Sequence, residues 1–138
     1  MIILDTNVIS EAMRPQPSAK VLAWLDAQHV QTLFTTSITW SELMLGLENL
    51  PDSKRKHGLQ ITLKAIQERM LKGRILAFDE AAAAQFGRLM IKTQRQGLVM
   101  GIADSQIAAI AHERRMPVAT RDTEPFLAAG LKVINPWD

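Results

Sequence analysis

Short apolar runs alternate with longer segments of helical spacing along the whole chain. The runs predict buried strands, and the segments between them, with apolar residues every three or four positions, predict helices. Strands separated by helices are typical of βαβ units, so we expect an α/β fold with a central parallel five-stranded sheet and helices on both faces. Strands are predicted over about 2–5, 32–36, 74–78, 117–120 and 131–134, and helices over about 6–13, 18–28, 37–50, 54–72, 79–96, 101–115 and 122–130.

Residues that favour helix N-caps precede several of these helices. Ser18, Ser37, Asp79 and Asp122 each stand at a predicted start, where a side-chain oxygen can accept a backbone N–H. The path of the two consecutive helices between the third and fourth strands is not fixed by the pattern.

The opening strand is apolar throughout and is therefore predicted to lie in the middle of the sheet. It runs directly into Asp5, Thr6 and Asn7. In open α/β sheets the carboxyl ends of the strands form the edge where ligands bind. Asp5 is thus either a simple N-cap of the next helix or part of a functional site.

Length and composition limit the possible classes of protein. A chain of 138 residues with 47% hydrophobic residues predicts one domain, residues 1–138, with a proper core. No apolar run approaches the roughly 18 residues of a membrane span, and no basic leader opens the chain. Cysteine is absent, which excludes disulfides and thiolate metal sites. We expect a cytoplasmic protein with no membrane contact.

Positive charge is unevenly distributed, although the net charge is only +2. The basic residues gather in three clusters: Lys54-Arg55-Lys56, Arg88/Lys92/Arg95 and Arg114-Arg115. Each cluster by itself is most simply a solvated helix face, but such clusters also suit a polyanionic partner. Aromatic residues are only 5% of the chain and tyrosine is absent, so base stacking would be sparse.

Four carboxylates are predicted to meet at the carboxyl edge of the sheet. Asp5 and Asp122 follow strands. Glu42 lies in the second turn and Asp104 in the first turn of helices whose N-termini reach the same edge. Asp122 alone is most simply an N-cap, and Asp104 alone could be an acid that favours the helix dipole. Four acids together favour a metal site.

The helical positions of two of these acids suggest that they point inward. Glu42 shares a face with Ile38 and Leu45, and Asp104 shares one with Ile107, Ala108 and Ala111. Buried carboxylates of like charge repel one another, and a bound cation relieves that repulsion.

An all-oxygen set of ligands suits a hard ion, so Mg²⁺ or Mn²⁺ is predicted. The metal ligands, and hence the catalytic residues, would be Asp5, Glu42, Asp104 and Asp122, with Thr6, Asn7 and Thr120 as supporting polar groups. Carboxylate-bound metal ions suit hydrolysis of a phosphodiester by an activated water.

The same segments resemble a known family. Ile3-Leu4-Asp5-Thr6-Asn7, Ser41-Glu42-Leu43, the run from Ile102 to Ala109 and Thr120-Arg121-Asp122 are similar to the motifs of PIN-domain ribonucleases. Among these, the chain is most similar to the VapC-type toxins of bacterial toxin–antitoxin pairs, in their FitB-like branch. At Arg121 it departs from the many members that carry Asn.

The resemblance implies a PIN-like sheet of strand order 3-2-1-4-5 and an Mg²⁺-dependent endoribonuclease that cleaves RNA. It also implies a cognate antitoxin, through which operator DNA would be contacted only indirectly, and we expect a homodimer. Arg121 is the first candidate for contact with the substrate.

Two other functions are considered. A receiver or phosphatase-like phosphotransfer domain would need a second acid near Asp5, where this chain has Thr6 and Asn7. A non-catalytic partner in an antitoxin–DNA repressor complex would keep the acids but cleave no RNA.

Overall fold

A parallel five-stranded sheet forms the centre of the molecule, in the strand order β3-β2-β1-β4-β5. The structure, a computed structural model, describes residues 1–138. The predicted fold class and strand order are therefore confirmed, with β1 in the middle. The strands are β1 Ile2–Leu4, β2 Leu33–Thr36, β3 Ile75–Leu76, β4 Val118–Ala119 and β5 Val133–Ile134.

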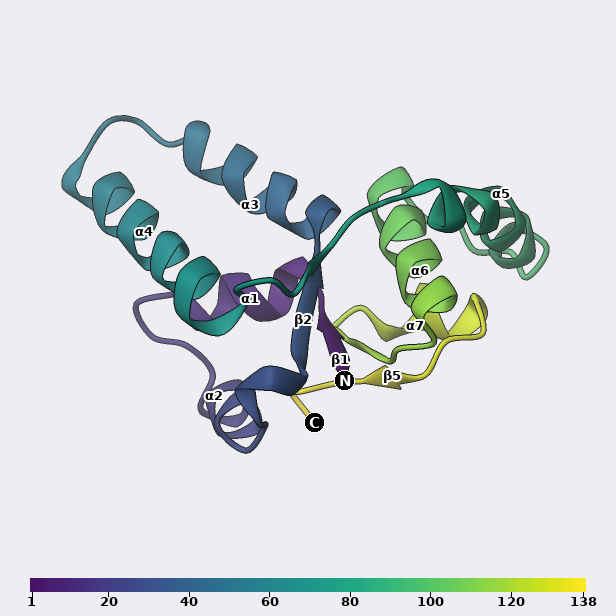
Figure 1. The fold of residues 1–138 in the computed structure, drawn as a ribbon, viewed down its shortest axis with the longest axis horizontal. Helices are drawn as coiled ribbons and strands as arrows, with labels where there is room; N and C mark the ends of the chain where they lie inside the picture. Colours follow the sequence, from purple (N-terminus) through teal and green to yellow (C-terminus); the bar gives the residue numbers. More distant parts are fainter.

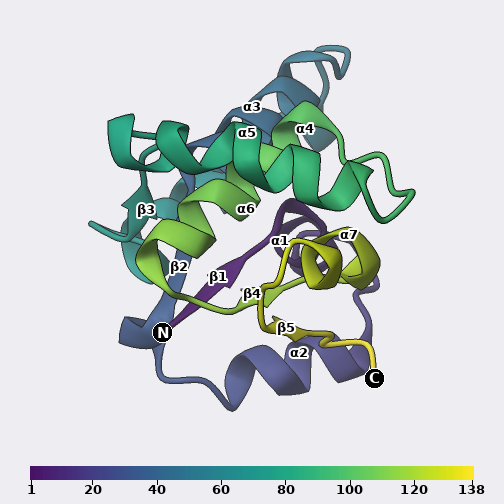
Figure 2. The ribbon, with the colours of Figure 1, turned by 90° about the vertical axis from the view of Figure 1, so that its right-hand side faces the viewer.

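Seven α-helices surround this sheet in two layers (Figures 1 and 2). Helices α1 to α4 pack on one face, and α5, α6 and α7 pack on the other. None of the helices combines the length and the apolar character that a bilayer crossing requires. The helices are α1 Thr6–Ala12, α2 Ala19–Asp26, α3 Ser37–Glu48, α4 Lys54–Ala65, α5 Glu80–Gln94, α6 Ile102–Arg114 and α7 Thr123–Ala128.

Alternation along the strands divides the core in two. Ile3 and Val118 point into the core under α5, α6 and α7, whereas Leu4 and Ala119 point into the core under α1 to α4. All four side chains are fully buried. Because β1 is covered on both faces, its polar successor Asp5 is placed at the edge between the two layers.

Two of the four predicted N-caps make the expected hydrogen bond. The side chains of Ser18 and Asp79 accept backbone N–H groups at the starts of α2 and α5, as predicted. The expectation for Ser37 is wrong, because the preceding Thr36 is the N-cap of α3 and accepts the N–H of Thr39. The predicted helix over 54–72 is α4 followed by a π-type turn at Ile66–Met70.

Helices α5 and α6, whose path the sequence left open, form an antiparallel hairpin on one face of the sheet (Figure 2). Arg114 at the end of α6 lies 4.0 Å from Asp79 at the start of α5. The N-terminus of α6 consequently lies at the carboxyl edge of the sheet, with Asp104 in its first turn.

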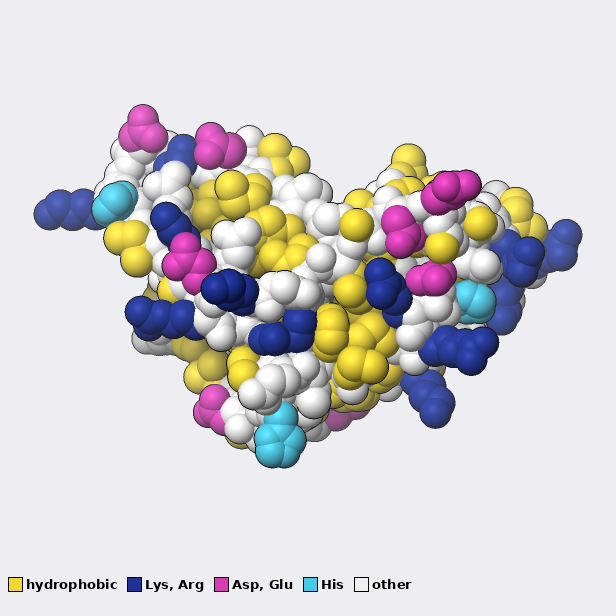
Figure 3. Space-filling model, in the orientation of Figure 1, with side chains coloured by type: hydrophobic (Ala, Val, Ile, Leu, Met, Phe, Trp, Pro, Cys, Tyr) yellow, Lys and Arg dark blue, Asp and Glu magenta, His cyan; other side chains and the backbone are white.

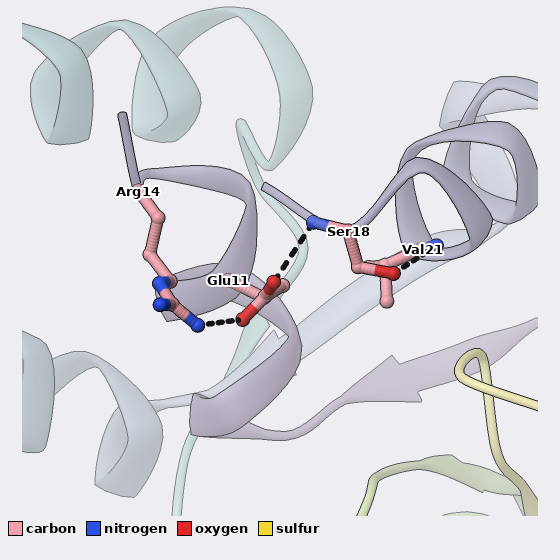
Figure 4. Close-up of polar contacts among 4 residues, drawn as sticks. All are labelled: Glu11, Arg14, Ser18 and Val21. Carbon is pink, nitrogen blue, oxygen red and sulfur yellow. Dashed lines mark hydrogen bonds and ion pairs between the residues drawn. The ribbon is translucent and has the colours of Figure 1, made fainter. Parts of the chain in front are cut away.

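Glu11 joins α1 to α2, as Figure 4 shows. One carboxylate oxygen accepts the backbone N–H of Ser18 at 2.8 Å, and the other accepts from Arg14 at 3.2 Å. The bond from Ser18, together with the Arg14 guanidinium, lowers the pKa of Glu11 below its ordinary value of 4.5. The charge on Glu11 therefore stabilises this connection.

Replacement of Glu11 by Gln should lower the melting temperature at neutral pH. A carboxylate whose pKa is lower in the folded chain stabilises the fold above the ordinary pKa, and that effect is lost as pH falls through the folded value. The difference between wild type and variant should thus shrink below about pH 4.5. Melts at pH 7 and pH 3, with exposed Glu48→Gln as the matched control, would measure this. A difference of equal size at both pH values would contradict the role of the charge.

Candidate active site

Asp5 lies at the end of the central strand and is almost fully buried, with 4% of its surface exposed. It is the N-cap of α1, and one of its oxygens accepts the N–H of Thr6 at 2.7 Å. Its other oxygen accepts the hydroxyl of Thr120 at 2.8 Å. Asp5 is therefore both the cap and a member of the polar cluster at the edge of the sheet.

Thr120 and Asn7 connect the two segments that leave β4 and β1. The hydroxyl oxygen of Thr120 accepts from the Asn7 amide and from the backbone N–H of Asp122, each at 3.1 Å. The amide oxygen of Asn7 in turn accepts the backbone N–H of Arg121 at 3.2 Å. These bonds fix the position of the Asp5 carboxylate relative to the start of α7. Thr120 and Asn7 thus lie where supporting polar residues were predicted.

Glu42 lies on α3 with its side chain exposed, and its carboxylate accepts the hydroxyl of Thr6 at 2.8 Å. The prediction that Glu42 points along a buried apolar face is wrong, since Leu45 is 62% exposed. Residues four apart form the buried stripe of α3, which leaves Glu42 on its flank, open to the edge of the sheet. The stripe consists of Thr39, Leu43 and Leu47.

Asp104 lies in the first turn of α6 and is half-buried, without a hydrogen-bond donor to its carboxylate. Ile107, Ala108 and Ala111 on its face are fully buried, as predicted. Burial raises the pKa of Asp104, and the charges of Asp122 and Glu42 raise it further.

Asp122 occupies the N-cap position of α7, but its exposed side chain makes no capping hydrogen bond. The simple cap interpretation therefore does not account for this carboxylate. Its charge acts on Asp104 instead.

The four acids influence one another electrostatically. Burial raises the pKa of Asp5 to about 6, although the bonds from Thr120 and Thr6 lower it, and Asp104 and Glu42 add to the rise. Asp104 is in turn affected by Asp122 and Glu42. All four lie at the carboxyl edge on separate elements. As the side chains stand, no three acidic or histidine residues form a closed set of metal ligands.

The donors nevertheless fit a hard cation chemically. They are all carboxylate oxygens, two of the acids carry pKa values raised in part by like charge, and the carboxylates of Asp104 and Asp122 accept no hydrogen bond. A cation among them would relieve the repulsion.

Two side chains near these acids escaped the sequence analysis. The hydroxyl of Thr39 lies 3.2 Å from that of Thr6, and the ring of Trp137 lies under the Arg121 guanidinium, 5.3 Å from its centroid. Thr39 is one of several polar residues on α3, and Trp137 is close to the C-terminus. Neither belongs to a pattern that sequence spacing reveals.

A groove of 740 Å³ adjoins the site and runs between α1, α3 and α4. Thr6 and Glu42 line the end nearest the acids, and leucines of α3 and α4 form part of its walls. Figure 3 also shows the surface hollowed between the part that carries α3 and α4 and the part that carries α5 and α6. Three cations line the groove: Arg14, Lys54 and Arg55.

Comparison with known proteins identifies the family. The PIN domain family matches residues 2–131. The chain is 47% identical over 138 residues to "VapC ribonuclease Y4jK" of Sinorhizobium fredii, covering all of this chain and 99% of that protein. It is 43% identical over 137 residues to "Toxin FitB" of Neisseria gonorrhoeae, covering 99% of both.

The fold agrees with these matches. A solved structure of FitAB bound to a DNA fragment superposes with a TM-score of 0.94 at 42% identity, over 100% of this chain and 96% of that one. The fold match and the predicted resemblance are thus both confirmed, whereas the roles of the individual acids stay predictions. PIN-domain nucleases are typically metal-dependent. The chain belongs to the PIN-domain family and, within it, to the VapC ribonuclease toxins.

Proposed function

We propose that this protein is an Mg²⁺- or Mn²⁺-dependent endoribonuclease that acts in the cytoplasm, as one domain, as the toxin of a toxin–antitoxin pair. The observation that carries the proposal is the cluster of Asp5, Glu42, Asp104 and Asp122 at the carboxyl edge of the sheet, in a chain of the VapC family. The ribonuclease names of its relatives supply the class of substrate.

Each residue of the cluster has a part in this proposal. Asp5, held by Thr6 and Thr120, is the fixed ligand, because its two oxygens are already oriented. Asp104 and Asp122 have carboxylates free of hydrogen bonds and complete the set with Glu42. A hard divalent cation bound there would supply a Lewis acid for the phosphodiester and lower the pKa of the attacking water.

A phosphotransfer function is less well supported. It would require an exposed aspartate as nucleophile and a second acid beside it. Asp5 is buried, its oxygens accept hydrogen bonds from Thr6 and Thr120, and Asn7 stands where the second acid would be. A non-catalytic role is separated from the proposal by the cleavage assay below.

The partners follow from the relatives and from two surfaces. Relatives have been solved as FitAB and VapBC complexes with DNA, so we infer a cognate antitoxin that contacts operator DNA on behalf of this chain. The groove beside Glu42, partly apolar and partly basic, would accept a segment of it. The exposed apolar tip of the α5–α6 hairpin, at Val99 and Ile102, would be buried in a homodimer.

The first test of this proposal is cleavage itself. RNA should be cleaved only with Mg²⁺ or Mn²⁺, and EDTA should abolish the reaction. Replacement of Asp5 by Asn should reduce the cleavage rate by at least about 100-fold. Mutation of a group that only supports a metal ligand already lowers metal affinity or activity by about 10- to 100-fold. Exposed Asp26→Asn is the control and should cleave normally. Undiminished cleavage in EDTA would rule out the mechanism.

Asp104→Asn separates a metal ligand from a residue that only stabilises its helix. Folding raises the pKa of the Asp104 carboxyl, so its charged form lowers the free energy of unfolding at pH values above that pKa. This destabilisation disappears as the pH falls, because the carboxyl is then protonated in both the folded and the unfolded chain. The metal-free variant should therefore melt higher than wild type at pH 8, and the advantage should vanish towards pH 4. The stabilisation by added Mg²⁺ should also decrease. A variant that melts lower without metal yet still cleaves RNA would make Asp104 an ordinary first-turn acid.

Arg121→Gln tests the predicted substrate contact. Loss of one phosphate contact should lower RNA affinity and reduce the slope of log K against log salt by about 0.7–0.9. The rise in melting temperature caused by Mg²⁺ should be unchanged, because Arg121 is not one of the proposed metal ligands. Exposed Arg69→Gln removes the same charge elsewhere and should leave the slope unchanged. Equal slopes for wild type and Arg121→Gln would exclude this contact.

A further inference from the structure

Two basic clusters that are separate in the sequence lie on one surface of the folded chain. Arg88, Lys92 and Arg95 share a face of α5 and line a hollow of 610 Å³. The Lys92 ammonium reaches the turn after α7, since its Nζ lies 2.6 Å from the point where a Cβ on Gly130 would stand.

Gly130 lines a second hollow, of 540 Å³, together with Arg115 after α6 and Lys132 before β5. We name the surface formed by these five exposed cations the basic strip: Arg88, Lys92, Arg95, Arg115 and Lys132. In Figure 3 Lys and Arg side chains gather on the side of the molecule that carries α5 and α6.

The charges of the basic strip have no partners within the protein. None of its five cations takes part in an ion pair, and no Asp or Glu lines either hollow. Arg114, by contrast, lies next to Arg115 and pairs with Asp79 and Glu113. Five unpaired positive charges lie here in a chain whose net charge is +2, so the rest of the chain is net negative.

Arg115 closes the C-terminus of α6. Its backbone is left-handed, with φ 57° and ψ 41°, and it is the only non-glycine residue of the chain with positive φ. Glycine suits this position after a helix, because a Cβ destabilises the left-handed conformation. The Arg115 side chain makes no ion pair or hydrogen bond that would offset this. The turn is held instead by backbone hydrogen bonds, in which the N–H of Arg115 donates to His112 and the N–H of Met116 to Ala111, and the Arg115 guanidinium stays free for a ligand.

The basic strip extends away from the acids. Arg115 follows Asp104 by 11 positions along α6, a distance of about 16 Å at 1.5 Å per residue. A short fragment bound at the acids would not reach it. An RNA stem of several base pairs would.

We propose that the basic strip is a second binding surface for the phosphodiester backbone of a folded RNA substrate. The inference rests on the ribonuclease function proposed above, and extends it by naming the form of the RNA. The acids would act on one segment of the RNA, while the strip holds a neighbouring stem through its phosphates. Such contacts are independent of base sequence, and each releases counterions from the RNA.

A binding experiment with two RNAs tests this surface. The probes are a fluorescently labelled hairpin with a ten-base-pair stem and a labelled single-stranded hexanucleotide, titrated in EDTA over a salt series. The variant is Lys92→Gln with Arg115→Gly and Lys132→Gln. We expect its hairpin affinity at low salt to fall at least tenfold and its salt slope by about 2–3, at about 0.9 per contact. Hexanucleotide affinity should change less than twofold.

The matched control removes three exposed cations outside the basic strip, as Lys20→Gln with Lys64→Gln and Lys72→Gln. Because the change in net charge is the same, this control should bind the hairpin within twofold of wild type. Arg115→Gly alone should melt at the same or a higher temperature, since glycine relieves the left-handed backbone. If the triple variant does not fold, Arg88→Gln with Arg95→Gln replaces it on the α5 side.

The outcomes distinguish the two proposals. An unchanged salt slope for the hairpin, beside normal metal-dependent cleavage by wild type, would overturn the second surface alone. An equal loss for hairpin, hexanucleotide and control variant would assign the effect to net charge and would also overturn it. Absence of metal-dependent cleavage of any RNA by wild type would overturn the ribonuclease function and, with it, the assignment of the strip to a substrate.

Discussion

The burial of one carboxylate at the end of the central strand is the constraint on which the site depends. Asp5 is covered by both helical layers and held by hydrogen bonds from Thr6 and Thr120. Its pKa rises from 3.8 to about 6, which corresponds to on the order of 3 kcal/mol against the ionised form. The fully buried core around Ile3 and Leu4 has to offset that cost, because no cation of the chain pairs with Asp5.

The parallel sheet determines which other residues come near Asp5. Strand β4 lies beside β1, so Thr120, one residue past its end, reaches the Asp5 carboxylate. Helices that run back across the sheet place their N-termini at the same edge, and α3 and α6 thereby bring Glu42 and Asp104 there. Acids that are 37 and 99 residues from Asp5 in the sequence consequently act on its pKa.

Charge is separated in this fold. The acids gather at one edge of the sheet, where their mutual repulsion favours a bound cation, whereas the basic strip lies along α5 and beyond the end of α6. A polyanion is attracted by the strip and repelled by the uncompensated acids. An arrangement of this kind suits a substrate that is held in one place and cleaved in another, once a metal has neutralised the acids.

The sequence by itself determined the α/β class and the N-caps Ser18 and Asp79, because hydrophobic period and capping are local. It also placed four acids at one edge of the sheet, because the order of strands and helices implies that edge. Glu42 was misplaced on a buried face, because which stripe of α3 points inward depends on packing against α1 and α6. The free carboxylate of Asp122 and the contact of Arg121 with Trp137 likewise arise only in the folded chain. Only the tertiary structure brought the cations of α5 close to Arg115 and Lys132. These residues are far apart in the sequence, and they become neighbours because α7 and β5 pack beside α5 and α6. No local sequence pattern indicates that packing.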